Sequence, residues 1–251
     1  MMKIIRAILL TGLITVIVIS GYNLLKIYNT YKAEGKMHNE VKQYKPGAPE
    51  DIHTDNTGSE EQETLLNQSI LDLQEKYKDA VGWITIPGTG IDYPFVQSAD
   101  NSFYLRKDIN GKYATAGTVF MDFRNNKDFT DFNTILYGHH MKNGTMFASL
   151  KQFNNKTFLD ANKNGTVFLA DKTYSIEFFA YMIVRTDDEV VYGIPADNGE
   201  KLHYIDHIKE TAVHFRDIGI TPADRIITLS TCSYEFKDAR MVLIGRVDAV
   251  Y

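Results

Sequence analysis

A single cysteine, Cys232, is the residue of this chain whose chemistry most needs an explanation. An unpaired cysteine is either a small hydrophobic side chain in a core or a reactive thiol. The residues before it, 226–231, read as a β-strand whose side chains alternate between two faces. Cys232 falls on the more polar face, together with Thr228 and Ser230. This position favours a reactive thiol over a buried one.

A cation is expected beside that thiol. A short polar connection, residues 233–239, follows Cys232, and Arg240 then opens a second strand-like run at 241–247. If the two runs pair as an antiparallel hairpin, Arg240 and Cys232 face each other across the mouth of the loop. A guanidinium at that point would stabilise negative charge on a thiolate, or on an oxyanion formed during acyl transfer.

A cysteine nucleophile also needs a proton acceptor, usually a histidine that is distant in sequence. His139 and His140 follow a strand-like run at 133–137, so we expect them at the end of a strand, as we do Cys232. Four further histidines are less suited, because they lie in a polar tract or a helical segment: His53, His203, His207 and His214. The residues alone fit a cysteine, histidine and arginine site, or a buried thiol among incidental surface histidines.

The motifs around these residues resemble the signature of the sortases, the cysteine transpeptidases of Gram-positive cell envelopes. The chain is most similar to class B of that family, over roughly residues 60 to 251. The resemblance rests on residues 228–232 (TLSTC) with Arg240 downstream, on residues 133–141 (NTILYGHHM) followed by Met146 and Phe147, and on residues 120–125 (FMDFRN).

The resemblance implies a role for each candidate. Cys232, as thiolate, would attack the substrate carbonyl, and Arg240 would hold the oxyanion. His139, rather than His140, would protonate the leaving amine and later deprotonate the incoming one. The spacing between Cys232 and Arg240 is at the short end for the family, which leaves Arg246 as an alternative cation.

Substrate contacts are expected from residues beside the thiol and from the segment after the sixth strand: Ser230, Thr231, Tyr192 and Ile194. Ser230 and Thr231 flank the thiol and are suited to binding peptide backbone. Tyr192 and Ile194 are assigned by the resemblance, and an ordinary surface aromatic ring explains Tyr192 equally well.

The resemblance also implies the reaction and its partners. Cys232 would form a thioester with the threonine of a C-terminal sorting signal in a secreted protein, of an Asn-Pro-x-Thr or related Pro-x-Thr type. An amine of a peptidoglycan precursor or cross-bridge would then take over the acyl group and fix the protein to the wall. No cofactor or metal is expected, because sulfur supplies the nucleophile and a guanidinium supplies the positive charge.

Two groups of residues resemble metal ligands. His203 and His207 are four residues apart on a predicted helix, a spacing that allows two imidazoles to share an ion, and His214 lies further along roughly the same side. A solvated helix face explains these histidines more simply. Asp187, Asp188 and Glu189 resemble a calcium-binding patch. Three consecutive side chains of an extended segment do not converge on one ion, so a solvated turn is the better interpretation.

Two other functions fit the same residues. One is a different transpeptidase, such as a pilin-polymerising sortase or an L,D-transpeptidase, although the latter places its histidine and cysteine close together in sequence. The other is a non-catalytic envelope module that only binds peptide, for which Cys232 would be dispensable.

The elements that must position this site are mainly strands. Short runs between polar or glycine-containing breaks predict eight of them, at 82–86, 91–96, 117–121, 133–137, 166–170, 173–184, 226–231 and 241–247. Their number favours a closed or nearly closed antiparallel barrel, and the resemblance implies an eight-stranded sortase-type β-barrel with peripheral helices. Helical periodicity predicts an N-terminal helix at 60–77, capped by Ser59, and a helix at 200–215 in the loop between the sixth and seventh strands.

The first 25 residues predict a single transmembrane anchor. Residues 7–25 are uncharged and apolar, and as a helix they nearly span a hydrocarbon core of roughly 30 Å. A signal peptide is the alternative, but the apolar run is longer than its usual core. Residues 26–59 are expected as an extracytoplasmic linker that begins as helix, and residues 60–251 as the catalytic domain on the extracellular side. Lys26, Lys32 and Lys36 weaken the charge argument for this orientation.

Composition excludes other classes of protein. The net charge of −5 gives no electrostatic footprint for nucleic acid. A chain with one cysteine has no internal disulfide, so its stability comes from packing. Hydrophobic residues make up 44% of the chain, which is enough to fill a core.

Overall fold

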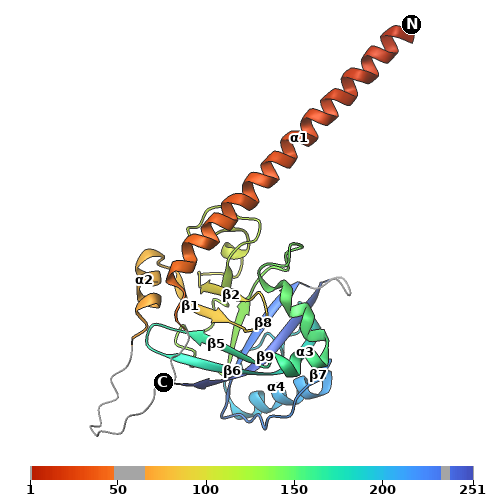
Figure 1. Ribbon diagram of the computed structural model, residues 1–251. Coiled ribbons are helices and arrows are strands. Elements are labelled where there is room, and N and C mark those ends of the chain that lie inside the picture. Colours follow the sequence, from red (N-terminus) through yellow and green to blue (C-terminus); the bar gives the residue numbers. More distant parts are fainter. Residues whose placement is uncertain (1, 48–65, 233–237, 251) are drawn as a thin grey trace. The chain divides into compact units, whose positions relative to one another are not determined.

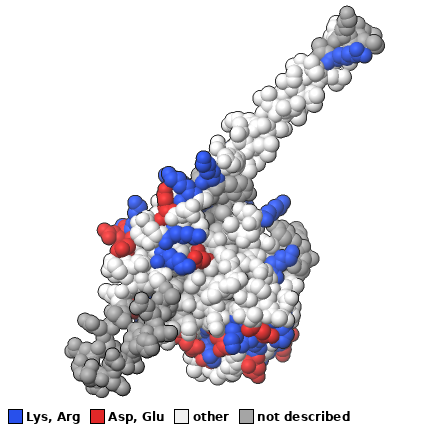
Figure 2. Space-filling view, viewed as in Figure 1, with Lys and Arg blue, Asp and Glu red and all other residues white. Residues whose placement is uncertain are grey.

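The computed structural model describes residues 2–47, 66–232 and 238–250, in two compact units, Met1–Gln43 and Tyr44–Tyr251. The first unit is formed by helix α1 (Met2–Val41). In the described part of the chain α1 is the one helix that is long and apolar enough to cross a membrane. Figure 2 shows its surface uncharged over most of its length. α1 therefore contains the predicted span and continues through the first part of the predicted linker, whereas residues 48–59 lie outside the described residues.

The second unit is built around a closed β-barrel (Figure 1). Eight strands follow one another in the order β5-β1-β2-β3-β4-β8-β9-β6, and pairing between β5 and β6 closes the barrel. They are β1 (Ala80–Thr85), β2 (Asp92–Val96), β3 (Val119–Met121), β4 (Asn133–Tyr137), β5 (Asn164–Phe168), β6 (Thr173–Arg185), β8 (Arg225–Cys232) and β9 (Ala239–Ala249). A further short strand, β7 (His214–Phe215), pairs with β6.

All eight predicted strands are confirmed, but the expected all-antiparallel arrangement is wrong. β2 pairs with β3 in parallel, and β4 pairs with β8 in parallel. Parallel neighbours need a long crossover connection, and the chain supplies one in each case, at 97–118 and at 138–224. Alternation of side chains is the same in parallel and antiparallel strands, which is why the pattern did not distinguish them.

The barrel interior and its outer face hold separate cores. Ile227 and Leu229 of β8 point into the interior, where they join the larger apolar cluster. Ile226 belongs to a second cluster, in which Tyr204 and Ile208 of a helix pack on β6 and β9. The alternation predicted for β8 therefore corresponds to two buried faces.

The described residues of the second unit also form five helical segments that surround the strands or connect them. In the second unit these are α2 (Gln68–Lys76), α3 (Lys156–Ala161), α4 (Asn198–Thr211), and the 3₁₀ helices η2 (Phe103–Arg106) and η3 (Phe147–Asn154); η1 (Lys42–Tyr44) follows α1. α4 lies between β6 and the next barrel strand, β8, which confirms the predicted helix between the sixth and seventh barrel strands.

The predicted bounds of two helices are wrong. α2 begins at Gln68 instead of residue 60, because Asn67 caps it by accepting from Ile70 N at 3.3 Å. Residues 60–65 of the predicted helix and its predicted cap Ser59 lie outside the described residues. α4 ends at Thr211, because residues 214–215 pair with the edge of β6 as β7.

Candidate active site

Three strand ends meet at one rim of the barrel. β4 and β8 run parallel, with Tyr137 opposite Ser230. Parallel strands end at the same edge of a sheet, so His139, just after β4, and Cys232, the last residue of β8, lie on the same rim. β9 returns antiparallel to β8, with Arg240 directly opposite Cys232. The rim thus brings together the backbones of the three predicted catalytic residues.

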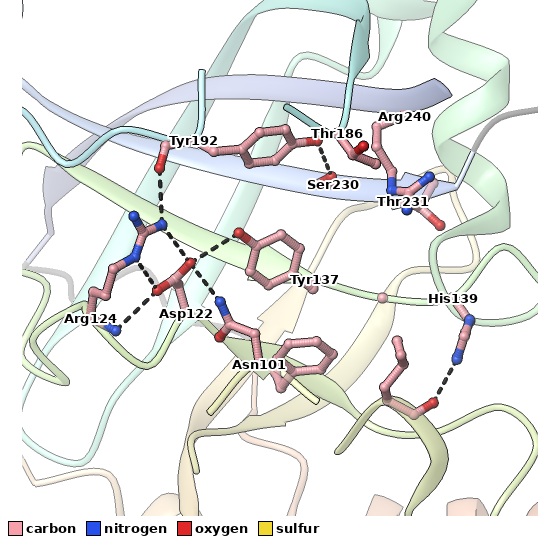
Figure 3. A pocket seen from close by; sticks show the side chains of 13 residues that line it. Asn101, Asp122, Arg124, Tyr137, His139, Thr186, Tyr192, Ser230, Thr231 and Arg240 are labelled. Atoms are coloured by element: carbon pink, nitrogen blue, oxygen red, sulfur yellow. Dashed lines mark hydrogen bonds and ion pairs between the residues drawn. The ribbon is translucent and has the colours of Figure 1, made fainter. Parts of the chain in front are cut away.

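A cavity of about 350 Å³ opens at this rim (Figure 3). The residues that line it are Asn101, Leu105, Phe120, Asp122, Arg124, Tyr137, Gly138, His139, Thr186, Tyr192, Ser230, Thr231 and Arg240. Five of the residues predicted for the site are in this set, whereas Ile194 lies outside the described lining. A concave space with apolar walls and a few polar groups is typical of a ligand site.

Cys232 is described through its backbone, as the residue that ends β8. The predicted hairpin is confirmed, since β8 and β9 pair continuously from Arg225 with Val247 to Cys232 with Arg240. Residues 233–237 of the predicted polar connection lie outside the described residues. The strand register therefore places the backbone of Cys232 directly after Thr231 and opposite Arg240, and both of these residues line the cavity.

His139 is oriented by a backbone carbonyl. Its Nε2 lies 2.6 Å from Leu105 O in η2. A carbonyl oxygen only accepts, so Nε2 carries the proton in this contact, and Nδ1 is the unprotonated nitrogen of the neutral ring. Partial burial lowers the pKa of His139, the Leu105 carbonyl opposes this shift, and the charge of Arg106 adds to it, so that the net pKa lies below its ordinary value. At neutral pH the ring is therefore neutral.

Arg240 is partly buried and lines the cavity, and its Nη1 donates to Ala239 O at 2.9 Å. The alternative cation, Arg246, lies at the other end of the same hairpin, opposite Ile226. There it forms ion pairs with Glu177 (3.2 Å) and Asp248 (3.0 Å). The geometry thus places Arg240, and not Arg246, at the cavity.

The polar face of β8 forms one wall of the cavity. The Ser230 hydroxyl is 2.8 Å from the Tyr192 hydroxyl, which joins the segment after β6 to the barrel. Thr231 is buried, and its hydroxyl has no hydrogen-bond partner in the described part of the chain. Tyr192 is therefore a cavity residue and not an ordinary surface ring.

A group of polar residues at the cavity was missed by sequence reasoning. The carboxylate of Asp122 is fully buried and accepts from Arg124 Nε and Nη2, both at 2.8 Å, from Asn101 Nδ2 at 2.9 Å and from Tyr137 OH at 3.0 Å. Arg124 Nη2 also donates to Tyr192 O at 2.9 Å. Figure 3 shows this group on one side of the cavity, away from Arg240 and His139. The signal available in the sequence was the Asp-x-Arg pattern within 120–125.

The net pKa of Asp122 is lowered despite its burial. Burial alone raises the pKa of this carboxyl group, but the hydrogen bonds from Arg124 and Asn101 outweigh it. The carboxylate is therefore ionised and forms a fixed pair with Arg124.

Several of the side chains that resembled metal ligands contact other groups instead. His207 Nε2 lies 3.2 Å from Asp188 Oδ2, while His214 Nε2 contacts Asn154 O at 2.7 Å from β7 and not from the helix. Asp187 pairs with Arg185 at 2.8 Å. In the described ranges, side chains of histidine, cysteine, aspartate and glutamate form no group of three that is suited to a metal ion.

Comparison with known proteins agrees with this geometry. A family model of the sortase domain matches residues 84–248. Sortase B of Listeria monocytogenes is 38% identical over 184 residues, which cover 72% of this chain and 75% of the relative. Sortase B of Staphylococcus aureus is 30% identical over 237 residues, which cover 94% of this chain and 93% of the relative.

Solved structures give the same result. The X-ray structure of Clostridium perfringens sortase B is 34% identical, with a TM-score of 0.67, and the match covers 71% of this chain and 98% of that one. The eight-stranded barrel, the family match and these relatives agree: the chain belongs to the sortase family of cysteine transpeptidases, and within it to class B.

Proposed function

We propose that this protein is a membrane-anchored transpeptidase that cleaves a C-terminal sorting signal after threonine and transfers the new carboxyl end to an amine of peptidoglycan. The observation that carries the proposal is the rim itself, where Arg240 stands opposite Cys232 and His139 lines the same cavity. Its membrane attachment is supported by the length and apolar character of α1.

The first half of the reaction forms a thioester. His139 takes the proton of the Cys232 thiol at Nδ1, while Nε2–H stays on the Leu105 carbonyl. The thiolate attacks the threonine carbonyl carbon, and Arg240 stabilises the oxyanion that forms. Collapse of this intermediate breaks the peptide bond, and the leaving amine takes the proton from His139.

The second half transfers the acyl group. An acceptor amine attacks the thioester carbonyl and passes one proton to His139 Nδ1. The new intermediate collapses to an amide and releases the thiolate of Cys232, which recovers the proton from His139. The thiol proton thus leaves with the first amine, the acceptor amine supplies its replacement, and the enzyme is restored without a cofactor.

The substrate is proposed to be a Pro-x-Thr signal of the Asn-Pro-x-Thr type, and the acceptor an amine of a peptidoglycan precursor or cross-bridge. The cavity suits an extended peptide, because the rings of Phe120, Tyr137 and Tyr192 lie among polar groups of Asn101 and Ser230. The resemblance of the sequence motifs to class B implies the same class of substrate.

A peptide panel tests this proposal. Full-length protein in detergent is incubated with quenched-fluorescent peptides that carry Asn-Pro-x-Thr, Ser-Pro-x-Thr or Leu-Pro-x-Thr motifs. We expect cleavage after threonine, abolished in Cys232→Ala, reduced about 10²–10⁴-fold in His139→Ala and about 10²–10³-fold in Arg240→Ala.

Two matched variants serve as controls. Arg246→Ala removes an arginine from the same hairpin, and His203→Ala removes an exposed histidine from α4; both are expected to leave cleavage unchanged. Cleavage that survives in Cys232→Ala would contradict the mechanism. Binding of the peptides without any cleavage would instead favour a peptide-binding module.

A further inference from the structure

Three hydrogen bonds tie the segment that carries the Leu105 carbonyl to the chain that precedes β3. Its neighbouring carbonyls accept from the segment that precedes β3: Thr118 N donates to Tyr104 O (3.1 Å), Ala114 N to Arg106 O (3.0 Å) and the Thr118 hydroxyl to Lys107 O (2.9 Å). The carbonyl of Leu105 is the one in this run that accepts from His139. The backbone of η2 is thus arranged so that this carbonyl points to the catalytic ring.

One side chain anchors η2 to the barrel. Tyr104 is 3% exposed, and its hydroxyl donates to Asp79 Oδ2 at 2.6 Å. Asp79 directly precedes β1, and its own carbonyl accepts from Gln97 N at 2.9 Å, after the end of β2. The Tyr104 hydroxyl therefore connects the rigid start of the sheet to the residue next to Leu105.

The chemistry of this contact favours a strong, directional bond. Burial and the Asp79 carboxylate both raise the pKa of Tyr104 above its ordinary value, so the phenol keeps its proton and donates it. Hydrogen bonds to an ionised acceptor are shorter and about twice as strong as neutral ones. Neither residue lines the cavity, so neither contacts the substrate there.

We propose that Asp79 and Tyr104 are positioning residues for His139: they hold the Leu105 carbonyl where it fixes the ring in the Nε2–H tautomer and leaves Nδ1 to carry the proton. In this arrangement a backbone carbonyl takes the orienting part that a carboxylate or amide side chain has in other nucleophile and base pairs. The inference rests on the proposed role of His139.

The first test is kinetic and uses Tyr104→Phe, which removes one hydroxyl and keeps the ring. Small misplacement of a catalytic group costs up to about 10²-fold in rate, so we expect kcat for peptide cleavage by the full chain to fall roughly 10-fold or more, with KM unchanged. Tyr174→Phe is the matched control, because it removes a buried hydroxyl that contacts Asp128 O and Arg225, remote from the cavity lining. Unchanged kcat in Tyr104→Phe, or an equal loss in Tyr174→Phe, would overturn the proposal.

The second test measures the tautomer of the His139 ring directly and needs no substrate. Nitrogen-15 shifts of histidine-labelled full-length protein in detergent report the tautomer of each ring, and His139→Gln identifies the signal of interest. We expect wild-type His139 in the Nε2–H form, and a mixture of tautomers in Tyr104→Phe. Asp79→Asn, which weakens the acceptor and keeps its shape, is expected to shift the population in the same direction and covers the case in which Tyr104→Phe does not fold.

The two tests separate this inference from the proposed function. If wild-type protein cleaves no peptide, the proposed substrate is wrong, and the tautomer measurement still decides whether Asp79 and Tyr104 orient His139. If wild-type protein cleaves and the tautomer of His139 is the same in all variants, the positioning role is wrong and the transpeptidase reaction stands.

Discussion

The pKa of His139 is lowered by burial and, to a smaller extent, by the charge of Arg106, and the contribution of Arg106 can be measured separately. Arg106 follows Leu105 in η2, and its guanidinium lowers the pKa of His139. The other ionisable side chains described in the cavity lining are those of Asp122, Arg124, Tyr137, Tyr192 and Arg240. In the proposed mechanism the reaction starts from neutral His139, so we expect protonation of this ring at low pH to remove activity.

Replacing Arg106 is therefore expected to change the pH profile. In the wild type the acidic limb of kcat/KM lies below the ordinary histidine pKa of about 6.5. Arg106→Gln removes a cation that disfavours the imidazolium, so the pKa of His139 rises and the limb moves to higher pH. The measurement is kcat/KM against pH, with Lys209→Gln on α4 as the control. If the acidic limb of kcat/KM in Arg106→Gln stays in place or moves to lower pH, Arg106 does not lower the pKa of His139 and the prediction is wrong.

The pair of Asp122 and Arg124 makes a prediction about stability. Arg124→Gln leaves a fully buried carboxylate without its cation. A fully buried pair that loses one partner costs roughly 3–5 kcal/mol, and because Arg124 is partly solvated we expect about 2–3 kcal/mol less free energy of unfolding at neutral pH. Arg185→Gln, which breaks an exposed pair, is expected to change it by less than about 0.5 kcal/mol.

The same pair fixes the pH dependence of that loss. The folded-state pKa of Asp122 is lowered, so its stabilising contribution is present above the unfolded value of about 3.9 and disappears as the pH falls through the folded value. Denaturant titrations of wild type and Arg124→Gln should converge in strong acid. A difference that persists unchanged below that range would show that the charge of Asp122 is not its source.

At the residue scale, the sequence predicted site residues that follow strands, but it did not predict contacts between side chains that are distant in sequence. Cys232, His139 and Arg240 could be found because each stands at a strand end with a distinctive neighbour pattern. The bond from Tyr104 to Asp79 joins residues 25 positions apart, and that from Arg124 to Tyr192 joins residues 68 apart. No local spacing encodes such contacts, so they had to be observed.

Among the elements, η2 carries the Leu105 carbonyl that contacts His139, and its position is constrained by the close approach of Gly117. Gly117 has φ +62, and a Cβ there would lie 2.6 Å from Tyr104 O and 2.7 Å from Leu105 O. An alanine would therefore push directly on the carbonyls of η2. Only glycine combines this backbone conformation with this close approach.

Gly117→Ala is expected to lower both stability and kcat, because η2 must move away and take the Leu105 carbonyl with it. Gly219→Ala is the matched control: its φ is +72, so the backbone strain is the same, but nothing lies within 4 Å of the added Cβ. Thermal unfolding and peptide cleavage are the measurements. Equal loss of kcat in both variants would mean that strain alone, and not displacement of η2, is responsible.

The strands were predictable and their directions were not. Alternation and turn residues located all eight barrel strands, since a half-buried strand is visible in the order of its side chains. The parallel pairing of β4 with β8, which brings His139 to the rim of Cys232, depends on the path of the 138–224 crossover. α4 shows a second limit: its periodic pattern continued to Phe215, but pairing with β6 overrides it there.

For the whole molecule, the division into two units predicts that they can be separated. Residues 44–251 contain every barrel strand and both apolar clusters, whereas α1 exposes long apolar side chains such as Ile14, Val16 and Leu24. We expect the fragment 44–251 to be folded and active on peptides without detergent, and the full chain to partition with membranes. Expression of both forms with membrane fractionation checks this; a full chain that stays in the soluble fraction would contradict the anchor.

The central claim is that catalysis passes through a thioester on Cys232, and mass spectrometry of the trapped enzyme tests it most directly. Full-length protein is mixed with a cleavable sorting peptide, quenched in acid within the first turnovers and digested. We predict that the fragment bearing Cys232 carries the acyl portion ending in threonine, that hydroxylamine releases it as the hydroxamate, and that Cys232→Ala forms no adduct. Cleavage without an adduct on Cys232, or cleavage retained in Cys232→Ala, would contradict the account.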